Sequence, residues 1–301
     1  MVNAKKTKMV STCGDKIFYG FINVFVVLMI IIVGVPLLHL LSASFSSPNA
    51  VVAGKVLLWP VNFSLEGYKA VFEHKLILTA YRNSMFYLVA GTAINIALTM
   101  IAAYPLSRSD MPGVKSITLI FTFTMIFHGG IIPGYLLVSG LGMLDTVWAM
   151  LIPGAISVYN LIVARSFIKS NVPKELLEAA QIDGCGDIQF FFRMVLPLSK
   201  AVIAVITLYY AIAHWNQYFN AMIYLNNQKL YPLQIVLKDI LIANQINANM
   251  VYDAEMAEAK QGLSELLKYS LIVVSVIPVL IIYPFVQKHF VKGVMVGSVK
   301  G

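Results

Sequence analysis

The residues of this 301-residue sequence that could do chemistry are few and widely spaced. Five histidines, at positions 39, 74, 128, 214 and 289, include no pair four residues apart and nothing with the ligand spacing of a zinc site. No phosphate-binding G-x-x-x-x-G-K-[ST] loop and no G-x-S-x-G nucleophile turn occurs. We therefore predict no catalytic residue and no metal or cofactor site on this chain.

Charged and polar residues gather instead in one short segment, "KSNVPKELLEAAQIDGCGDIQFFFRMVLPLSK", at residues 169–200. Pro173 suits an early helix position, Glu175 and Glu178 suit the first turns of a helix dipole, and Gly184 suits the left-handed residue that closes a helix. The segment therefore predicts a helix of about 11 residues that ends at a glycine corner.

A second short helix is predicted after that corner, with Asp187 as its cap and Pro197 at its end. Its expected apolar face consists of Ile188, Phe191, Phe192, Val195 and Leu196. Ala179 and Ala180 of the first helix are expected on the exposed side, where small residues allow a partner to approach closely.

The elements that flank this segment are predicted to be membrane spans. The chain is 59% hydrophobic and 12% charged, whereas soluble domains are about 25% charged. Six windows lack Asp, Glu, Lys and Arg, and each reaches the ~17–25 residues that cross a bilayer. We predict an all-α integral membrane protein, a single transmembrane domain over 1–301, with spans at about 18–41, 83–105, 116–138, 147–166, 198–225 and 269–286.

Basic residues predict the orientation of these spans. With the N-terminus inside, fourteen Lys and Arg residues lie on the cytoplasmic side and eight on the other. This places both termini and the segment 169–197 in the cytoplasm, beside anionic membrane lipid, and the +8 charge then needs no nucleic acid to explain it. Cys13 and Cys185 fall on the reducing side, so no disulfide is expected.

A group of aromatic and amide residues lies near the outer end of the fifth predicted span. Aromatic faces stack on sugar rings and amides match hydroxyl groups, so these residues could line a sugar pathway. They could equally form an interfacial aromatic belt. The candidates are Trp215, Asn216, Gln217, Tyr218 and Asn220, with His128 in the third span as a further candidate that could instead be a packed bundle histidine.

The polar segment carries a resemblance. "EAAQIDGCGDIQFFFRMVLP" is similar to the EAA signature of membrane subunits of binding-protein-dependent ABC importers: E-A-A, three residues, G, nine residues, a branched apolar residue, one residue, L-P. Met194 replaces the usual Ile. Beyond it, "FSLEGYKAVF", "IIPGYLLVSGLGMLDTVWAMLIPG", "WNQYFNAMIYL" and "HFVKGVMVGSVKG" resemble the carbohydrate-uptake branch, in particular the maltose-type permeases of oligosaccharide and polysaccharide-fragment importers.

The resemblance implies a six-span permease subunit in a bacterial cytoplasmic membrane. It implies a second homologous permease, an ATPase dimer inside that holds ATP and Mg²⁺, and an extracytoplasmic solute-binding protein that touches the long loop before span six. The ATPase-coupling residues that it implies are Glu178, Ala179, Ala180, Asp183, Gly184, Leu196 and Pro197.

Two other classes remain as alternatives. A self-contained secondary carrier for a small polar solute would need intramembrane ion-coupling residues, which the predicted spans lack. An intramembrane enzyme is disfavoured by the scattered histidines.

Overall fold

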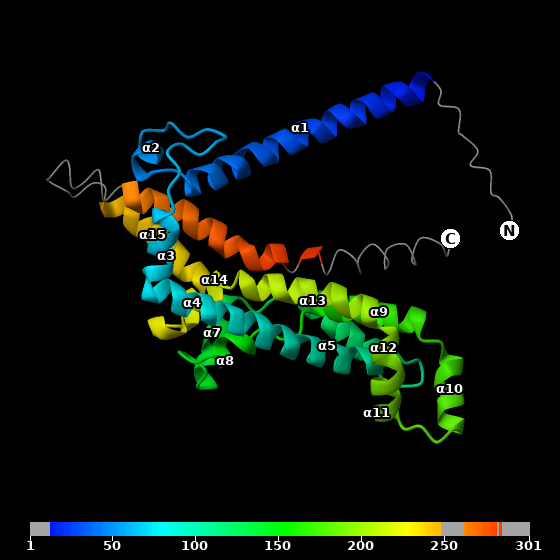
Figure 1. The fold of residues 1–301 in the computed structure, drawn as a ribbon. Coiled ribbons are helices and arrows are strands. Elements are labelled where there is room, and N and C mark those ends of the chain that lie inside the picture. Colours follow the sequence, from blue (N-terminus) through cyan, green and yellow to red (C-terminus); the bar gives the residue numbers. More distant parts are fainter. Residues whose placement is uncertain (1–12, 248–261, 282, 285–301) are drawn as a thin grey trace. The chain divides into compact units, whose positions relative to one another are not determined.

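The computed structural model describes all residues except 1–12, 248–261, 282 and 285–301, and the regular elements in the described part are helices (Figure 1). The chain divides into two compact units. The first comprises Met1–Ala70 and Asn247–Val273, and the second comprises Val71–Ile246 and Val274–Gly301.

The first unit begins with α1, Cys13–Ser44, whose apolar side chains are exposed almost throughout. At 1.5 Å per residue its 32 residues extend about 48 Å, more than the hydrocarbon thickness of a bilayer. Near its end, Ala43 of α1 packs in a small core with Ala50 of α2, Pro48–Val52, and with Val56. Because the apolar surface of α1 surrounds the helix on every side, it suits a lipid environment.

The second unit is built around a long helical stretch, Lys75–Ser107. It comprises α4, Lys75–Phe86, the π-helical turn η1, Tyr87–Gly91, and α5, Thr92–Ser107. The core lies where α5 packs against α9, Val158–Asn171, and α13, Lys200–Trp215. The remaining elements are α3 (Glu66–Glu73, which begins in the first unit), α6 (Val114–Ile126), α7 (Ile131–Gly140), α8 (Trp148–Leu151), α14 (Tyr218–Tyr224), η3 (Gln228–Leu230) and α15 (Leu233–Asn247).

Three helices of the described part are long and apolar enough to span a membrane: Gly14–Ser44, Lys75–Ser107 and Gly262–Ile281. Two further spans result if each of two bent helix pairs crosses once. One pair is α6 with α7, bent by 114°, and the other is Asp187–Leu198 with α13, bent by 80°. The prediction of an all-α membrane protein is thus confirmed.

Two predicted spans are less regular than the charge-free windows suggest. The third, 116–138, contains the bend between α6 and α7, next to Gly130, whose φ is +88°. The fourth, 147–166, is interrupted between α8 and α9, where Pro153 cannot donate a backbone hydrogen bond and Gly154 has a φ of +74°. Proline and glycine are tolerated at membrane depth when neighbouring groups satisfy the freed backbone.

Candidate functional site

The polar segment folds as predicted into a short helix closed by a glycine. This helix, α10, is Lys174–Ile182, and Asp183 follows it as the C-cap. Gly184 has a φ of +79° and donates its N–H to Gln181 O at 3.0 Å, while Cys185 donates to Ala180 O at 2.9 Å. This pair of bonds is a Schellman motif. Since an L-residue pays about 1–2 kcal/mol for the left-handed conformation, glycine is the residue that closes α10 without strain.

One face of α10 packs on the bundle. Leu176 and Leu177 contact the core cluster that α5 and α9 share, and Ala180 is buried within that cluster. The expectation that Ala180 lies on the exposed side is therefore wrong. Ala180 comes three and four residues after the two leucines, which places it on their face of the helix.

The other face of α10 is exposed and mixes charge with apolar surface. Glu178 and Ala179 lie on it, together with Glu175 and Asp183, and the side chain of Ile182 is 87% exposed. The residues 175, 178, 179 and 182 follow the i, i+3, i+4, i+7 spacing of one helix face. Sequence reasoning missed Ile182, although this spacing could have found it. The exposed face of α10 (Glu175, Glu178, Ala179 and Ile182) is a surface without a neighbour in the described part of the chain.

Glu178 has one local ionic contact on this face. Lys174 Nζ lies 2.9 Å from Glu178 Oε1, one helical turn away, and the hydrogen bond raises the pKa of Lys174. Both side chains are more than half exposed, so the pair contributes little to stability. The carboxylate of Glu178 is thus presented to the surroundings and not used to hold the fold.

The second short helix differs from the prediction. α11 is Asp187–Phe190, a π-helical turn, η2, occupies Phe191–Val195, and α12 is Leu196–Leu198. Gly186 takes the N-cap position, and Asp187 is the first helical residue. Phe191 and Val195 are buried as predicted, but Ile188 and Phe192 are 77% and 61% exposed. The wider π turn shifts the phase of the 3.6-residue pattern, which buries Phe190 in their place.

The motif ends at the junction with α13. Leu196 is partly buried against the core, Pro197 is exposed, and Met194 is 39% exposed. Pro197 lies inside α12 and does not end the helix by itself. The 80° bend follows at Ser199, between α12 and α13.

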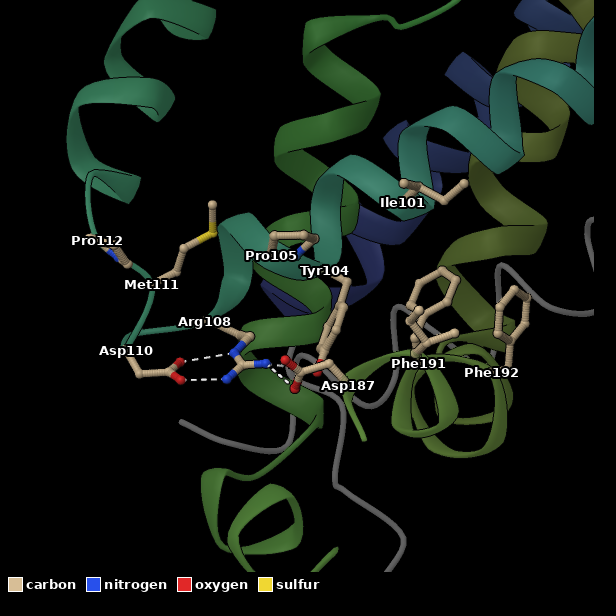
Figure 2. Close-up of a pocket in the computed structure, with 11 residues that line it drawn as sticks. Ile101, Tyr104, Pro105, Arg108, Asp110, Met111, Pro112, Asp187, Phe191 and Phe192 are labelled. Carbon is tan, nitrogen blue, oxygen red and sulfur yellow. Dashed lines mark hydrogen bonds and ion pairs between the residues drawn. The ribbon is translucent and has the colours of Figure 1, made fainter. Parts of the chain in front are cut away.

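Beside the polar segment lies a cavity of about 560 Å³ (Figure 2). One wall is ionic: Arg108, just after α5, pairs with Asp110 and with Asp187. Asp110 holds the pKa of the guanidinium above its usual range, and Arg108 lowers the pKa of Asp110 to about 2. The opposite wall is apolar, with Ile101, Phe191 and Phe192. Sequence reasoning gave Arg108 and Asp187 no joint role.

Of the pathway candidates, Trp215 and Gln217 are held by internal contacts. Trp215 is 2% exposed, its Nε1 donates to Ser275 O at 3.1 Å, and its ring meets Tyr81 edge-on at 5.9 Å. Gln217 Nε2 donates to Met150 O at 3.0 Å. These contacts give Trp215 a packing role.

The other pathway candidates are more accessible. Asn216 is exposed, although its Nδ2 donates to Ile212 O at 3.0 Å, and Asn220 is half-buried. Tyr218 is half-buried beneath Lys238, whose Nζ lies 5.2 Å from the ring centroid. His128 is exposed in the bend between α6 and α7. The structure does not gather these residues into one cavity in the part it describes.

A buried polar seam lies between α5 and α13, which the sequence analysis did not predict. His214 is 3% exposed, and its Nε2 lies 3.0 Å from Asn95 Nδ2. One turn away, the hydroxyl oxygens of Thr99 and Tyr210 are 2.6 Å apart. The His214 ring packs on Gly91, where a Cβ would come within 2.2 Å of the ring. The signal was available, since Asn95 and Thr99 are four residues apart, as are Tyr210 and His214.

Comparisons with known proteins identify the family. Residues 111–296 match the pattern of "Binding-protein-dependent transport system inner membrane component". The chain belongs to this family.

Named relatives cover the chain from end to end. It is 41% identical over 288 residues to the "Polygalacturonan/rhamnogalacturonan transport system permease protein YtcP" of Bacillus subtilis, covering 95% of this chain and 98% of that protein. It is 37% identical to "Protein LplC" of the same organism, over 100% of this chain and 98% of that one. A crystal structure of "a bacterial ABC transporter involved in the import of the acidic polysaccharide alginate" superposes with a TM-score of 0.86 at 34% identity, covering 94% of this chain and 100% of the matched one.

Proposed function

We propose that the chain is the permease subunit of an ABC importer for oligosaccharide fragments of acidic polysaccharides. The observation that carries this proposal is the 41% identity to a polygalacturonan and rhamnogalacturonan permease over 95% of the chain. The likeness to a transporter for alginate, a second acidic polysaccharide, favours the same substrate class. Recognition of such a substrate needs hydroxyl partners and a positive charge.

The chain itself does no chemistry in this proposal. Two ATPase subunits would hold ATP and Mg²⁺, and a second, homologous permease would complete the pathway. An extracytoplasmic solute-binding protein would deliver the sugar. The long loop expected to meet that protein falls partly outside the described residues, and the C-terminal tail, residues 289–301, lies wholly outside them. Both termini would lie in the cytoplasm of a bacterial cell, following the excess of Lys and Arg on that side.

Coupling to the ATPase is assigned to the exposed face of α10. Glu178 offers a charge, Ala179 allows close approach, and the 87% exposed Ile182 offers apolar area. The buried face of the same helix rests on the core of the second unit. Gly184 fixes where α10 stops, while Asp183, Leu196 and Pro197 complete the loop that returns the chain to α13. A push on α10 would therefore reach the spans.

The sugar pathway is assigned to the accessible candidates Tyr218, Asn216, Asn220 and His128. Trp215 and Gln217 would shape that pathway from behind, because their polar groups are already bonded to Ser275 and Met150. Lys238, above the ring of Tyr218, supplies a positive charge next to an aromatic face. That pairing suits the carboxylate and the ring of a uronic acid.

The test is uptake by the native complex. Cells that express the chain, and cells that lack it, would be given labelled oligogalacturonides and, in parallel, labelled maltooligosaccharides. We expect chain-dependent uptake of the first that persists with an ionophore while ATP remains. Uptake that collapses with the ionophore would instead identify a secondary carrier. If the chain supports uptake of the neutral sugar alone, the assignment as an importer subunit stands, but the proposal of an acidic substrate is wrong.

A further inference from the structure

Arg108 joins two segments that are far apart in the sequence. It is the first residue after α5, and its Nη1 pairs with Oδ1 of Asp187, 79 positions later, at the start of α11. Its Nε also donates to Asp110 Oδ1 at 2.9 Å, but Asp110 belongs to the same link as Arg108. Figure 2 shows the guanidinium between the two carboxylates. The Asp187 pair is therefore the contact of this cluster that connects different elements.

The guanidinium is held in place more firmly than an ordinary surface arginine. Its side chain is only 16% exposed, and its carbon lies 5.9 Å from the centroid of the Tyr104 ring. Tyr104 in turn packs against the rings of Phe190 and Phe191, with centroids 6.3 and 5.6 Å away. An arginine that uses both edges of its fork and rests on a ring has a fixed direction. Little side-chain freedom remains to be lost when it pairs with Asp187.

The neighbouring helix end is tied to the same place. Arg165 of α9 donates from Nε to the carbonyl oxygen of Leu106, at the end of α5, at 2.8 Å. Figure 1 shows α10 and α11 at the end of the second unit where α5 stops. Two arginines thus bind near the end of α5: Arg165 links it to the middle of α9, and Arg108 links the residue after it to the start of α11.

The chain itself offers a less direct route from α10 to the spans. It passes from α11 through the π turn η2 and then turns by 80° before α13. A π turn and a sharp bend are places where a helix can flex. A displacement of α10 along this route alone would be absorbed in part before it reached α13, whereas the Arg108 to Asp187 contact leads straight into α5.

We propose that Arg108 and Asp187 are positioning residues that transmit movement of the loop 169–197 to α5. Since α13 packs directly on α5, it then moves with α5. This inference rests on the proposed importer function, because it presumes that an ATPase moves α10. The apolar contacts of Phe190 and Phe191 with Tyr104 hold the loop against the bundle, and the ion pair sets the direction in which the loop is held.

The sharpest variant is Asp187→Asn. The carboxylate is 59% exposed and Arg108 keeps Asp110, so neither a cavity nor an unpaired buried charge results. We expect normal recovery of the complex and continued ATP hydrolysis. The amount of sugar moved per ATP should fall about fivefold, the lower end of the usual range for coupling between sites.

Two matched variants distinguish loss of the contact between elements from loss of a negative charge beside Arg108. Asp110→Asn makes the same chemical change on the same guanidinium without breaking a contact between elements. Its amide oxygen can still accept from Arg108 Nε, so the sugar-to-ATP ratio should stay unchanged. Asp187→Glu keeps the charge and should restore most of the ratio. Equal losses in Asp110→Asn and Asp187→Asn, or a lower yield of complex in both, would mean a general structural role and overturn the proposal.

The experiment uses the complete complex in proteoliposomes. The binding protein and labelled oligogalacturonides are on one side of the membrane, and ATP is on the other. A wild-type complex that hydrolyses ATP without moving the probe would contradict the proposed substrate and not the ion pair. For that case, hydrogen exchange with and without a non-hydrolysable ATP analogue tests the pair directly. The analogue should change protection at 100–112 and at 174–198 in wild type, but only at 174–198 in Asp187→Asn. Identical patterns in both proteins would refute the proposal.

Discussion

The loop around α10 and the turn that carries Trp215 use their polar residues in opposite ways. On α10, Glu178 and Ile182 face away from the bundle, and Glu178 forms an exposed ion pair with Lys174. At the turn after α13, Trp215 and Gln217 direct their donors inward, to the backbone oxygens of Ser275 and Met150. Accessible polar groups suit contact with another protein, as proposed for α10, whereas polar groups that are buried and already hydrogen-bonded suit a junction between helices.

This difference indicates which residues of each region are accessible to a partner. Residue type alone does not separate the two roles, because Trp, Gln and Asn suit both a sugar site and a helix junction. Accessibility does separate them. The predictions that follow test whether the α10 loop acts through its surface and the Trp215 turn through its packing.

The largest effect is expected from reversing the charge of Glu178. Glu178→Lys should reduce sugar uptake at least about tenfold. If the partner surface is complementary to Glu178, a lysine at this position meets a like charge, which costs several kcal/mol. The amount of the chain in the membrane should not change, since the side chain is more than half exposed. Glu175→Lys makes the same change three residues earlier. If both variants lose uptake equally, the specific role of Glu178 is wrong.

Trp215→Ala should come next, through loss of folded protein. Removing a buried large aromatic side chain costs about 3–5 kcal/mol, and the hydrogen bond from the indole N–H to the carbonyl of Ser275 is lost. We expect a lower unfolding temperature and a smaller amount of assembled complex, while the molecules that do assemble keep their KM for sugar. Asn216→Ala, at the exposed neighbouring position, is the control for folding and should keep the wild-type unfolding temperature and amount of complex. A raised KM with normal stability in Trp215→Ala would instead make this residue part of the sugar site.

A moderate effect is expected at the glycine that closes α10. Gly184→Ala meets no neighbouring atom within 4 Å, so its whole cost is the left-handed backbone at φ +79°, about 1–2 kcal/mol. Gly186→Ala, two residues later, has equally open surroundings and a φ of −77°, and it should cost nothing comparable. Limited proteolysis of the loop and sugar uptake would measure both. Equal behaviour of the two variants would show that the helix end plays no part in coupling.

The sequence predicts local features better than it predicts contacts between distant segments. The charge-free window 17–54 covers all but the first four residues of α1, and the spacing from Pro173 to Gly184 predicts α10 and its cap, because both depend on neighbours in the chain. The π turns η1 and η2 leave no such mark, so the predicted apolar face with Ile188 and Phe192 is wrong. The pairing of Arg108 with Asp187 depends on how α5 and α11 pack, which no local pattern encodes.

The smallest expected effect is a pH dependence of stability at the Arg108 cluster. Arg108 lowers the pKa of Asp110 from 3.8 to about 2 in the folded protein. A depressed carboxyl pKa stabilises the fold above the ordinary value, and that contribution disappears as the pH falls toward the folded value. The difference in unfolding temperature between wild type and Asp110→Asn should therefore be constant from about pH 8 to 5 and shrink below about pH 4. A difference that already shrinks between pH 8 and 5 would show that Asp110 is not held by Arg108 as the structure has it, and would weaken the case that this guanidinium has a fixed direction toward Asp187.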